Sequence, residues 1–338
     1  MGGDIGPAVT MIALRKFMVE HSRLRVILFG AEPTTAFPDD QESAQLASRV
    51  QFVNCSSVVE SGERPSSALR HKGGSSMALA VQAVADGDAS ACVSAGNTGA
   101  LMAFGLQKLK TLPGISRPAI CSPIPTRSGD VLALDLGANI DCSAAQLHQF
   151  ALLGALTARI VNGIANPKLK LLNIGLEANK GMKSVQEAAT LLAEDVRINY
   201  CGFIEADRLF HGDADVVVCD GLSGNIALKA SEGVASMISD IFRDHINSHW
   251  LSRLAFRVFM RSTASLSQRL HPSRYNGAYL LGLNGIIIKS HGGADSQSFY
   301  EALNLARLAA GENLPSVLAP LLASDLSASV HQTRCGDE

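Results

Sequence analysis

Short aliphatic runs alternate with longer helical patterns between about residue 24 and residue 318. Apolar runs bounded by Gly, Asp or Asn predict buried strands, and apolar positions spaced three or four residues apart predict helices. The expected strands lie at residues 25–30, 51–54, 91–93, 131–134, 171–174, 216–219 and 285–288. This alternation predicts an α/β fold, a Rossmann-like three-layer sandwich in which a mostly parallel sheet has helices on both faces. A helix is expected over residues 75–85.

Several of these predicted strands end in the same kind of polar segment, which combines Gly with Asp, Asn, Lys or His before the next helix. The segments are residues 94–99, 135–142, 173–181, 220–225 and 289–295. Ligands of open parallel sheets bind beyond the carboxyl ends of the strands. We therefore expect the five segments to share one site at one edge of the sheet.

The segment at residues 94–99 has the clearest chemistry. It reads as strand, Gly-rich turn and helix N-terminus, an arrangement that points backbone N–H groups at an anion such as phosphate. The expected phosphate-binding residues are Ser94, Gly96, Asn97, Thr98 and Gly99. An alternative is that Asn97 and Thr98 only cap the helix that follows.

A long helical pattern interrupts the alternation from residue 225 to about residue 269. Within it, Arg253, Arg257 and Arg261 recur every four residues and share one face, and Trp250 stands at the start of this basic stretch. Such a helix suits an anionic membrane surface or an acidic protein partner. The alternative is a solvated arginine face beside a dimer interface.

Composition narrows the possible functions. The chain has 338 residues, 47% of them hydrophobic, and a formal net charge of −2, so no bulk attraction to nucleic acid is expected. Seven cysteines occur without a CxxC pair, which argues against a disulfide framework or a structural zinc site and favours a cytoplasmic protein. The sequence shows neither a signal peptide nor an apolar run long enough to span a membrane.

Several motifs together resemble those of the bacterial phosphate acyltransferase (PlsX) family, in that family's order and spacing from residue 1 to about residue 310. The motifs are MGGDIGP at 1–7, SAGNTGALM at 94–102, DLGANIDC at 135–142, CDGLSGN at 219–225, YNGA at 275–278 and KSHGGAD at 289–295. The resemblance implies reversible transfer of a fatty acyl group from acyl carrier protein to inorganic phosphate. We expect the acyl phosphate product to serve phospholipid synthesis, and we expect no cofactor or metal. A single domain is expected over residues 1–330, and the helical segment at about 226–270 lies within it.

The resemblance also implies a homodimer and contact with a membrane that holds a glycerol-3-phosphate acyltransferase. In the family a first strand precedes the MGGD motif, so we expect the natural chain to start upstream, with Asp4 at the end of that strand. The acidic run that the family has before Lys180 is reduced here to Glu177.

Candidate roles follow from the strand-end positions. Lys180 is the expected fixed cation for phosphate, and Asn139 and Asn225 are expected either to orient the carbonyl or phosphate or to cap helices. Asp135 and Asp220 are candidates for positioning protons or a lysine.

Three further candidates are less defined. His291 is either an acid–base group or a hydrogen-bonded structural residue. Arg70 either adds positive electrostatic potential for the phosphate or lies on a solvent-exposed face. For Cys142, apolar packing is expected rather than a nucleophilic role.

Two other functions stay open at this stage. A phosphate acetyltransferase on a related scaffold needs a similar phosphate cradle, whereas a dehydrogenase is disfavoured because no G-x-G-x-x-G follows a strand. A catalytically lapsed scaffold that binds membranes through the arginine-rich helix is the other alternative.

Overall fold

The computed structural model describes residues 3–31, 45–55, 57–248 and 272–332. The larger sheet contains β3 (Ala91–Ser94), β4 (Ala119–Thr126), β5 (Gly129–Leu134), β6 (Lys168–Leu172), β7 (Asn199–Ile204), β8 (Val216–Val218), β9 (Ala278–Leu281) and β10 (Ile286–Lys289). The smaller sheet pairs β1 (Val26–Gly30) with β2 (Val50–Asn54). These bounds confirm the expected strands to within a few residues.

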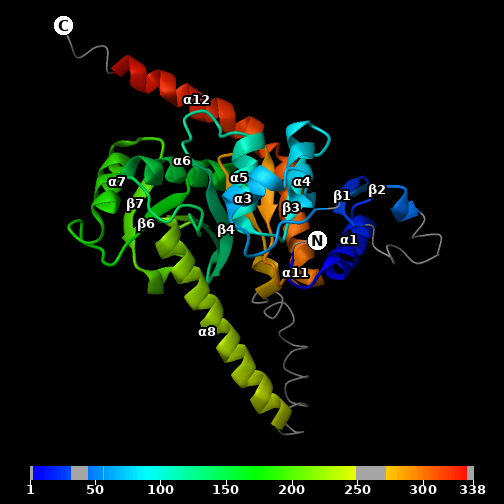
Figure 1. The fold of residues 1–338 in the computed structure, drawn as a ribbon. Coiled ribbons are helices and arrows are strands. Elements are labelled where there is room, and N and C mark those ends of the chain that lie inside the picture. Colours follow the sequence, from blue (N-terminus) through cyan, green and yellow to red (C-terminus); the bar gives the residue numbers. More distant parts are fainter. Residues whose placement is uncertain (1–2, 32–44, 56, 249–271, 333–338) are drawn as a thin grey trace.

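Helices cover both faces of the larger sheet (Figure 1), as the sequence predicts. One face packs against α6 (Ala144–Val161), α7 (Lys183–Glu194), α11 (Ser296–Gly311) and α12 (Leu314–Gln332). The other packs against α3 (Pro65–His71), α4 (Ser76–Ala85) and α5 (Thr98–Lys108). We call the second face the α5 face. Short 3₁₀ helices η1 (Ala206–Arg208) and η2 (Pro272–Tyr275) lie in connections.

The direction of the strands changes across the sheet. The order is β3-β10-β9-β4-β5-β8-β6-β7, and four of the seven neighbouring pairs are parallel. The three antiparallel pairs lie in the middle, so β5, β8, β6 and β7 run opposite to β3 and β10. The carboxyl ends of these two groups therefore lie at opposite edges of the sheet, and the expectation of one shared edge is wrong.

A tight hairpin produces part of this reversal. Only Arg127 and Ser128 separate β4 from β5, and a connection of two residues joins antiparallel strands, because a parallel pair needs a long crossover. The sequence pattern predicts the polar strand ends but neither β4 nor β9, so the change of direction is not expected from it.

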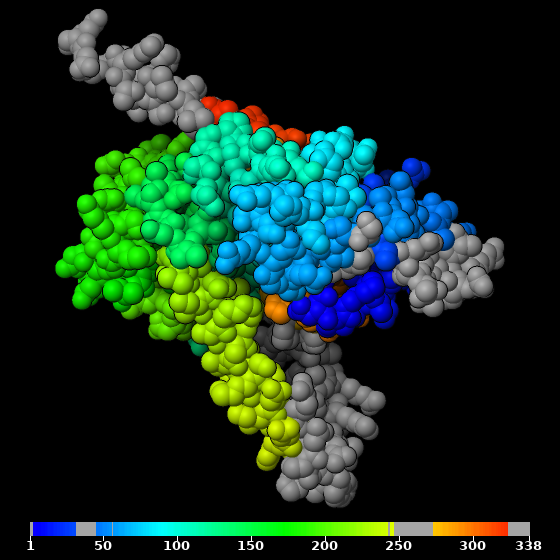
Figure 2. Space-filling model, in the orientation of Figure 1, coloured from blue at the N-terminus to red at the C-terminus, as the bar shows by residue number. Residues whose placement is uncertain are grey.

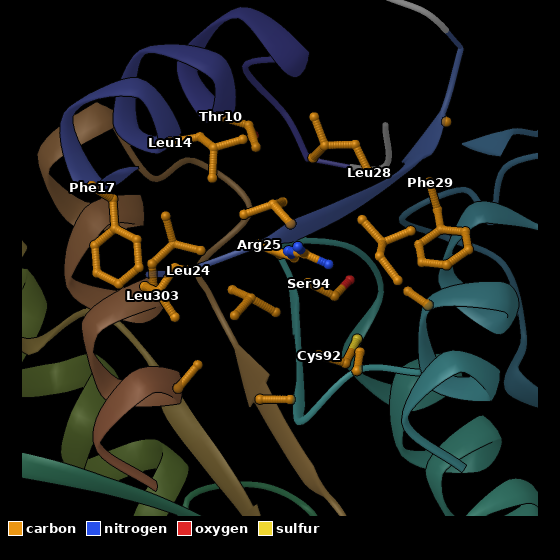
Figure 3. A pocket seen from close by; sticks show the side chains of 18 of the residues that line it. Thr10, Leu14, Phe17, Leu24, Arg25, Leu28, Phe29, Cys92, Ser94 and Leu303 are labelled. Atoms are coloured by element: carbon orange, nitrogen blue, oxygen red, sulfur yellow. The ribbon is translucent and has the colours of Figure 1, made fainter. Parts of the chain in front are cut away.

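A cavity separates the two sheets. Helix α1 (Pro7–Glu20) lies beside β1, and between β1 and β3 there is a space of about 580 Å³. Leu14, Phe17 and Leu303 line one side of it, and Cys92 and Ser94 of β3 line another (Figure 3). Among the described residues β1 pairs only with β2 and β3 only with β10, so both strands present an unpaired edge to this cavity.

Helix α8 (Gly221–Ser248) extends well beyond the body of the protein (Figures 1 and 2). Its 28 residues span about 42 Å. Leu228, near its beginning, packs on the α5 face, whereas large apolar side chains farther along are exposed. The exposed set is Val234, Met237, Ile238, Ile241 and Phe242. Trp250, Arg253, Arg257 and Arg261 lie outside the described residues.

Candidate functional site

The loop after β3 has the geometry of an anion cradle. Ser94 Oγ accepts a hydrogen bond from the N–H of Gly96 at 3.2 Å, which fixes the turn. Helix α5 then begins at Thr98, so the first-turn N–H groups of Thr98 and Gly99 have no carbonyl four residues earlier in the helix. These two donors and the positive end of the helix dipole suit a phosphate oxygen.

Asn97 builds this loop instead of offering its side chain to a ligand. Its Oδ1 accepts from the N–H of Ala100 at 3.0 Å and caps α5. Its Nδ2 donates to the carbonyl oxygens of Glu60, Ser61 and Glu63 at 3.3, 2.8 and 2.9 Å. The capping interpretation thus describes Asn97, and its side-chain donors hold residues 60–63 against the cradle.

The neighbouring strand brings a lysine to the same place. Lys289 ends β10 and is the register partner of Ser94. Ile287 packs on the α5 face and Ile288 on the opposite face, so alternation turns Lys289 toward the α5 face. Cys92 and Val93 alternate in the same way, which turns Ser94 to that face as well.

The Lys289 ammonium is largely withdrawn from solvent. Its Nζ donates to the carbonyl oxygen of Ala95 at 3.5 Å and to that of Ser290. Burial lowers the pKa of Lys289 from 10.5 to about 8, and the charge of Asp4 partly offsets this effect. A partly buried cation therefore lies directly beside the phosphate cradle.

The segment after β10 completes this edge. The N–H of Asp4 donates to the carbonyl oxygen of Gly292 at 2.9 Å, so the N-terminal motif lies against the KSHGGAD motif. Asn276 Oδ1 accepts from the N–H of His291 at 2.9 Å, and its Nδ2 donates to Ser290 Oγ at 2.9 Å. Asn276 thereby ties the loop before β9 to the end of β10.

The exposed ring of His291 has a defined tautomer. The N–H of Gly293 donates to His291 Nδ1 at 3.1 Å, which makes Nδ1 an acceptor. In the neutral ring the proton is then on Nε2. His291 can accordingly present an N–H donor to an oxygen bound at this edge.

Asp135 and Asn139 lie at the opposite edge of the sheet, and their side chains are held by hydrogen bonds to neighbouring protein groups. Asp135 is fully buried, and its carboxylate accepts from the N–H groups of Ile120, Gly137, Ala138 and Asn139 at 2.7 to 3.2 Å. Asn139 Nδ2 also donates to this carboxylate, and Asn139 Oδ1 accepts from the Nε of Arg117 at 2.7 Å. Burial raises the pKa of Asp135, while these donors oppose the rise.

Asp220 and Asn225 belong to the same opposite edge. The Asp220 carboxylate accepts from the N–H of Ser223 at 2.8 Å and from its Oγ at 2.7 Å, which caps the beginning of α8. Asn225 lies on the first turns of α8 beside Gly137.

Lys180 is distant from the phosphate cradle. It follows β6, which is seventh in the strand order, whereas β3 is first and runs in the opposite direction. Six strand spacings amount to roughly 29 Å. The expectation that Lys180 lies near residues 94–99 is therefore wrong; Lys180 and Glu177 are exposed at the far edge.

Two other candidates have simple surroundings. Arg70 is exposed in the last turn of α3, the helix that packs beside α5. Cys142 is buried, and burial raises the pKa of its thiol to about 12, which disfavours the thiolate. Within the described residues, no group of three or more His, Cys, Asp or Glu is arranged to hold a metal ion.

Sequence reasoning missed Lys289 and Asn276 as site residues. Both lie inside motifs that the sequence analysis quotes, and a lysine placed directly after three isoleucines is an unusual end for a buried strand. That pattern is a usable signal, because burying an ammonium group costs free energy unless the group has a role.

The fold is similar to that of solved phosphotransacylases. It resembles a branched-chain phosphotransacylase from Enterococcus faecalis, with a TM-score of 0.57 and 17% identity over 91% of this chain and 96% of that chain. It also resembles a phosphotransacetylase from Streptococcus pyogenes, with a TM-score of 0.51 and 17% identity over 90% and 98% of the two chains. At this identity the likeness shows a shared phosphotransacylase-like fold.

Sequence comparison identifies the family. A family model described as fatty acid synthesis protein matches residues 1–317. The phosphate acyltransferase of Halorhodospira halophila is 46% identical over 318 residues, 94% of this chain and 93% of the relative. That of Saccharophagus degradans is 44% identical over 332 residues, 98% and 96% of the two chains. The chain belongs to the phosphate acyltransferase family and is an acyltransferase.

Proposed function

We propose that the protein transfers a fatty acyl group from acyl carrier protein to inorganic phosphate at the edge formed by the carboxyl ends of β3 and β10. The observation that supports this location is the juxtaposition of the α5 N-terminus with Lys289, which provides backbone donors and a cation for one phosphate. Ser94, Gly96, Thr98 and Gly99 form the cradle in this proposal.

The reaction is balanced without an enzyme-bound intermediate. An oxygen of phosphate attacks the thioester carbonyl, the carbon–sulfur bond breaks, and the proton of the phosphate hydroxyl ends on the departing thiol of the carrier. The products are an acyl phosphate and free carrier. Holding phosphate beside the carbonyl supplies proximity, and His291 Nε2–H is a candidate donor for the developing oxyanion.

One assay tests the reaction. The protein is incubated with palmitoyl-acyl carrier protein and phosphate, and free carrier and acyl phosphate are measured. Turnover with this donor and not with acetyl-CoA supports the proposal. Turnover with acetyl-CoA alone would favour a phosphate acetyltransferase, and turnover with neither donor would favour a lapsed scaffold.

We also propose that α8 joins two copies of the chain. Val234, Met237, Ile238 and Ile241 are between 45% and 61% exposed, and their spacing puts them along one stripe of the helix. An exposed apolar stripe of this kind marks a contact surface. Replacing Ile238 and Ile241 with Asp is expected to give monomers, measured by light scattering after gel filtration.

The membrane contact is a separate part of the proposal. No helix among the described residues has the length and apolar character needed to cross a bilayer. We propose peripheral contact of a cytoplasmic enzyme with anionic lipid through Arg253, Arg257 and Arg261, which would release acyl phosphate near a membrane glycerol-3-phosphate acyltransferase. Replacing the three arginines with Glu should abolish sedimentation with anionic vesicles while acyl transfer in solution continues.

A further inference from the structure

A chain of buried polar side chains holds one arginine at the edge of the sheet opposite the phosphate cradle. Arg117 is exposed just before β4, and its Nε donates to Asn139 Oδ1 at 2.7 Å. Asn139 is 5% exposed, and its Nδ2 donates at 2.9 Å to the carboxylate of Asp135, which is fully buried. The three side chains therefore form a continuous hydrogen-bonded path from the interior of the protein to its surface.

The backbone of Asn139 is fixed as well as its side chain. The N–H of Gly221, the first residue of α8, donates to the carbonyl oxygen of Asn139 at 2.7 Å. A Cβ added at Gly221 would lie 2.5 Å from the same oxygen, so the two segments are in direct contact. The carbonyl oxygen of Pro118 accepts from Asn139 Nδ2 at 2.9 Å. The acceptor that orients Arg117 is thus held from α8, from the end of β5 and from the residue before β4.

Most of the Arg117 guanidinium is available to a ligand. Within the part of the chain that the structure describes, the bond to Asn139 is the one hydrogen bond that this side chain makes. A guanidinium has five N–H donors in a planar fork that matches the oxygens of a phosphate or a carboxylate. Because Asn139 fixes the Nε, the two Nη groups form a preorganised pair of donors for such an anion.

Large exposed apolar side chains lie next to this network in the chain. Ile140 follows Asn139 and is 74% exposed, and Leu222 follows Gly221 and is 52% exposed. Ile226, one turn farther along α8, is 58% exposed. Exposed apolar side chains beside an oriented cation suit a ligand that carries both an anionic group and an apolar chain.

The anion for Arg117 is not the phosphate of the cradle. Arg117 precedes β4, which is fourth in the strand order, whereas β3 is first. Three strand spacings amount to roughly 14 Å, and the two sites lie at opposite edges of the sheet, which adds to the separation. In the proposed reaction the other substrate is acyl carrier protein. Its phosphopantetheine arm is a long flexible chain with a phosphodiester at one end and the acylated thiol at the other.

We propose that Arg117, oriented by Asn139, binds the phosphodiester of the phosphopantetheine arm and so anchors the acyl donor. This inference rests on the proposed function. An arm anchored at this edge extends toward the β3–β10 edge, where its thioester meets the phosphate. Arg117 contacts the substrate, and Asn139 is a positioning residue that acts through Arg117.

Carrier binding without acyl transfer tests the assignment directly. Isothermal titration is carried out with holo-carrier, which has the arm with a free thiol, and with apo-carrier, which lacks the arm. The unmodified protein is compared with Arg117→Gln and with Arg208→Gln, a matched control in which the exposed arginine is already paired with Asp213 at 2.7 Å. We expect holo-carrier to bind Arg117→Gln about tenfold more weakly or worse, with apo-carrier binding unchanged and no effect in the control.

Steady-state kinetics and a double variant give the second readout. Arg117→Gln should raise the KM for palmitoyl-acyl carrier protein by the same factor and leave the KM for inorganic phosphate unchanged, and Arg117→Lys should lie between, because lysine keeps the charge without the fork. Asn139→Ala should weaken holo-carrier binding in the unmodified protein but add no further loss in the Arg117→Gln background. Circular dichroism and melting temperature establish which variants are folded, and the Arg117 variants decide the assignment if Asn139→Ala is not.

The results separate this assignment from the proposed function. Weaker holo-carrier binding in Arg117→Gln, with no acyl transfer by the unmodified protein, would support the arginine and overturn the reaction. Unchanged holo-carrier binding in folded Arg117→Gln would overturn the assignment. Equal losses for holo-carrier and apo-carrier would place the anion among the carboxylates of the carrier surface and overturn the arm as the ligand. Weaker binding of inorganic phosphate to the same variant would show that Arg117 and the cradle hold one anion, which would also overturn the assignment.

Discussion

Ser94 and Lys289 are register partners at the ends of two parallel strands, and both side chains lie on the α5 face of the sheet. Their residue numbers differ by nearly two hundred, yet β3 and β10 are direct neighbours. The Ser94 hydroxyl shapes the turn that carries the backbone donors, and Lys289 adds the charge. One register contact therefore brings together the two halves of the proposed anion site.

Asn97 is expected to affect stability and phosphate use together. Asn97→Ala removes the α5 cap and the three hydrogen bonds to residues 60–63, with a loss of about 1–3 kcal/mol. The melting temperature should fall and the KM for phosphate should rise tenfold or more. Asn97→Ser is the matched control, because its hydroxyl keeps a capping oxygen and loses the three donors without adding a charge. Unchanged kinetics in Asn97→Ala would contradict the cradle.

The pH dependence of phosphate use should reflect Lys289. Its pKa is lowered by burial to about 8, with Asp4 and Lys229 acting on it in opposite directions. Below this pH the ammonium is charged, so the KM for phosphate should rise as the pH increases through about 8. Lys289→Arg should flatten the profile, since arginine stays charged. The same rise in the Arg variant would assign the titration to another group.

The same pKa shift has an effect on folding with a definite sign. Between about pH 8 and 10.5 the folded state binds fewer protons at Lys289 than the unfolded state does. The contribution of this group to the free energy of unfolding therefore increases with pH over that window. Urea unfolding of the unmodified protein and Lys289→Gln at pH 7 and pH 10 should show a smaller stabilising effect of the substitution at pH 10. An equal difference at both pH values would show that Lys289 titrates elsewhere.

Asp135 should act as a structural residue. In the unmodified protein the Asp135 carboxylate accepts from several backbone N–H groups, and Asp135→Asn places an amide N–H donor beside them. We expect the free energy of unfolding, measured with urea, to fall by about 2–3 kcal/mol. Phosphate binding should be unchanged at a temperature where the variant is folded, because Asp135 lies at the other edge of the sheet. Asp141→Asn, at an exposed position in the same loop, is the control. A stable Asp135→Asn variant without activity would instead indicate a catalytic role.

The cavity between β1 and β3 has room for one further extended strand. An extended segment there would fill about 580 Å³ and pair with both unpaired strand edges. A short strand-forming extension rich in Val and Ile, added before residue 1, should raise the melting temperature by several degrees. An extension of equal length rich in Gly and Ser serves as the control. Equal melting temperatures for all three chains would show that such a strand is dispensable.

Local patterns in the sequence determined much of this protein. Aliphatic runs predict the strands, the spacing of apolar residues predicts α4, and the Gly-rich segment at 94–99 predicts a turn followed by a helix N-terminus. These features depend on residues close together in the chain, where pattern and backbone geometry are directly linked. The family also follows from local motifs, because each motif keeps its order and spacing.

The tertiary structure alone decided which strand ends meet. The antiparallel middle strands β9, β4 and β5 separate two groups of carboxyl ends that look alike in sequence, so Lys180 and Asp135 lie far from the cradle. The pairing of β10 with β3 places Lys289 there instead. The physical reason is that long-range packing and the direction of each connection determine which strands are neighbours. The residues at a strand end specify neither of these.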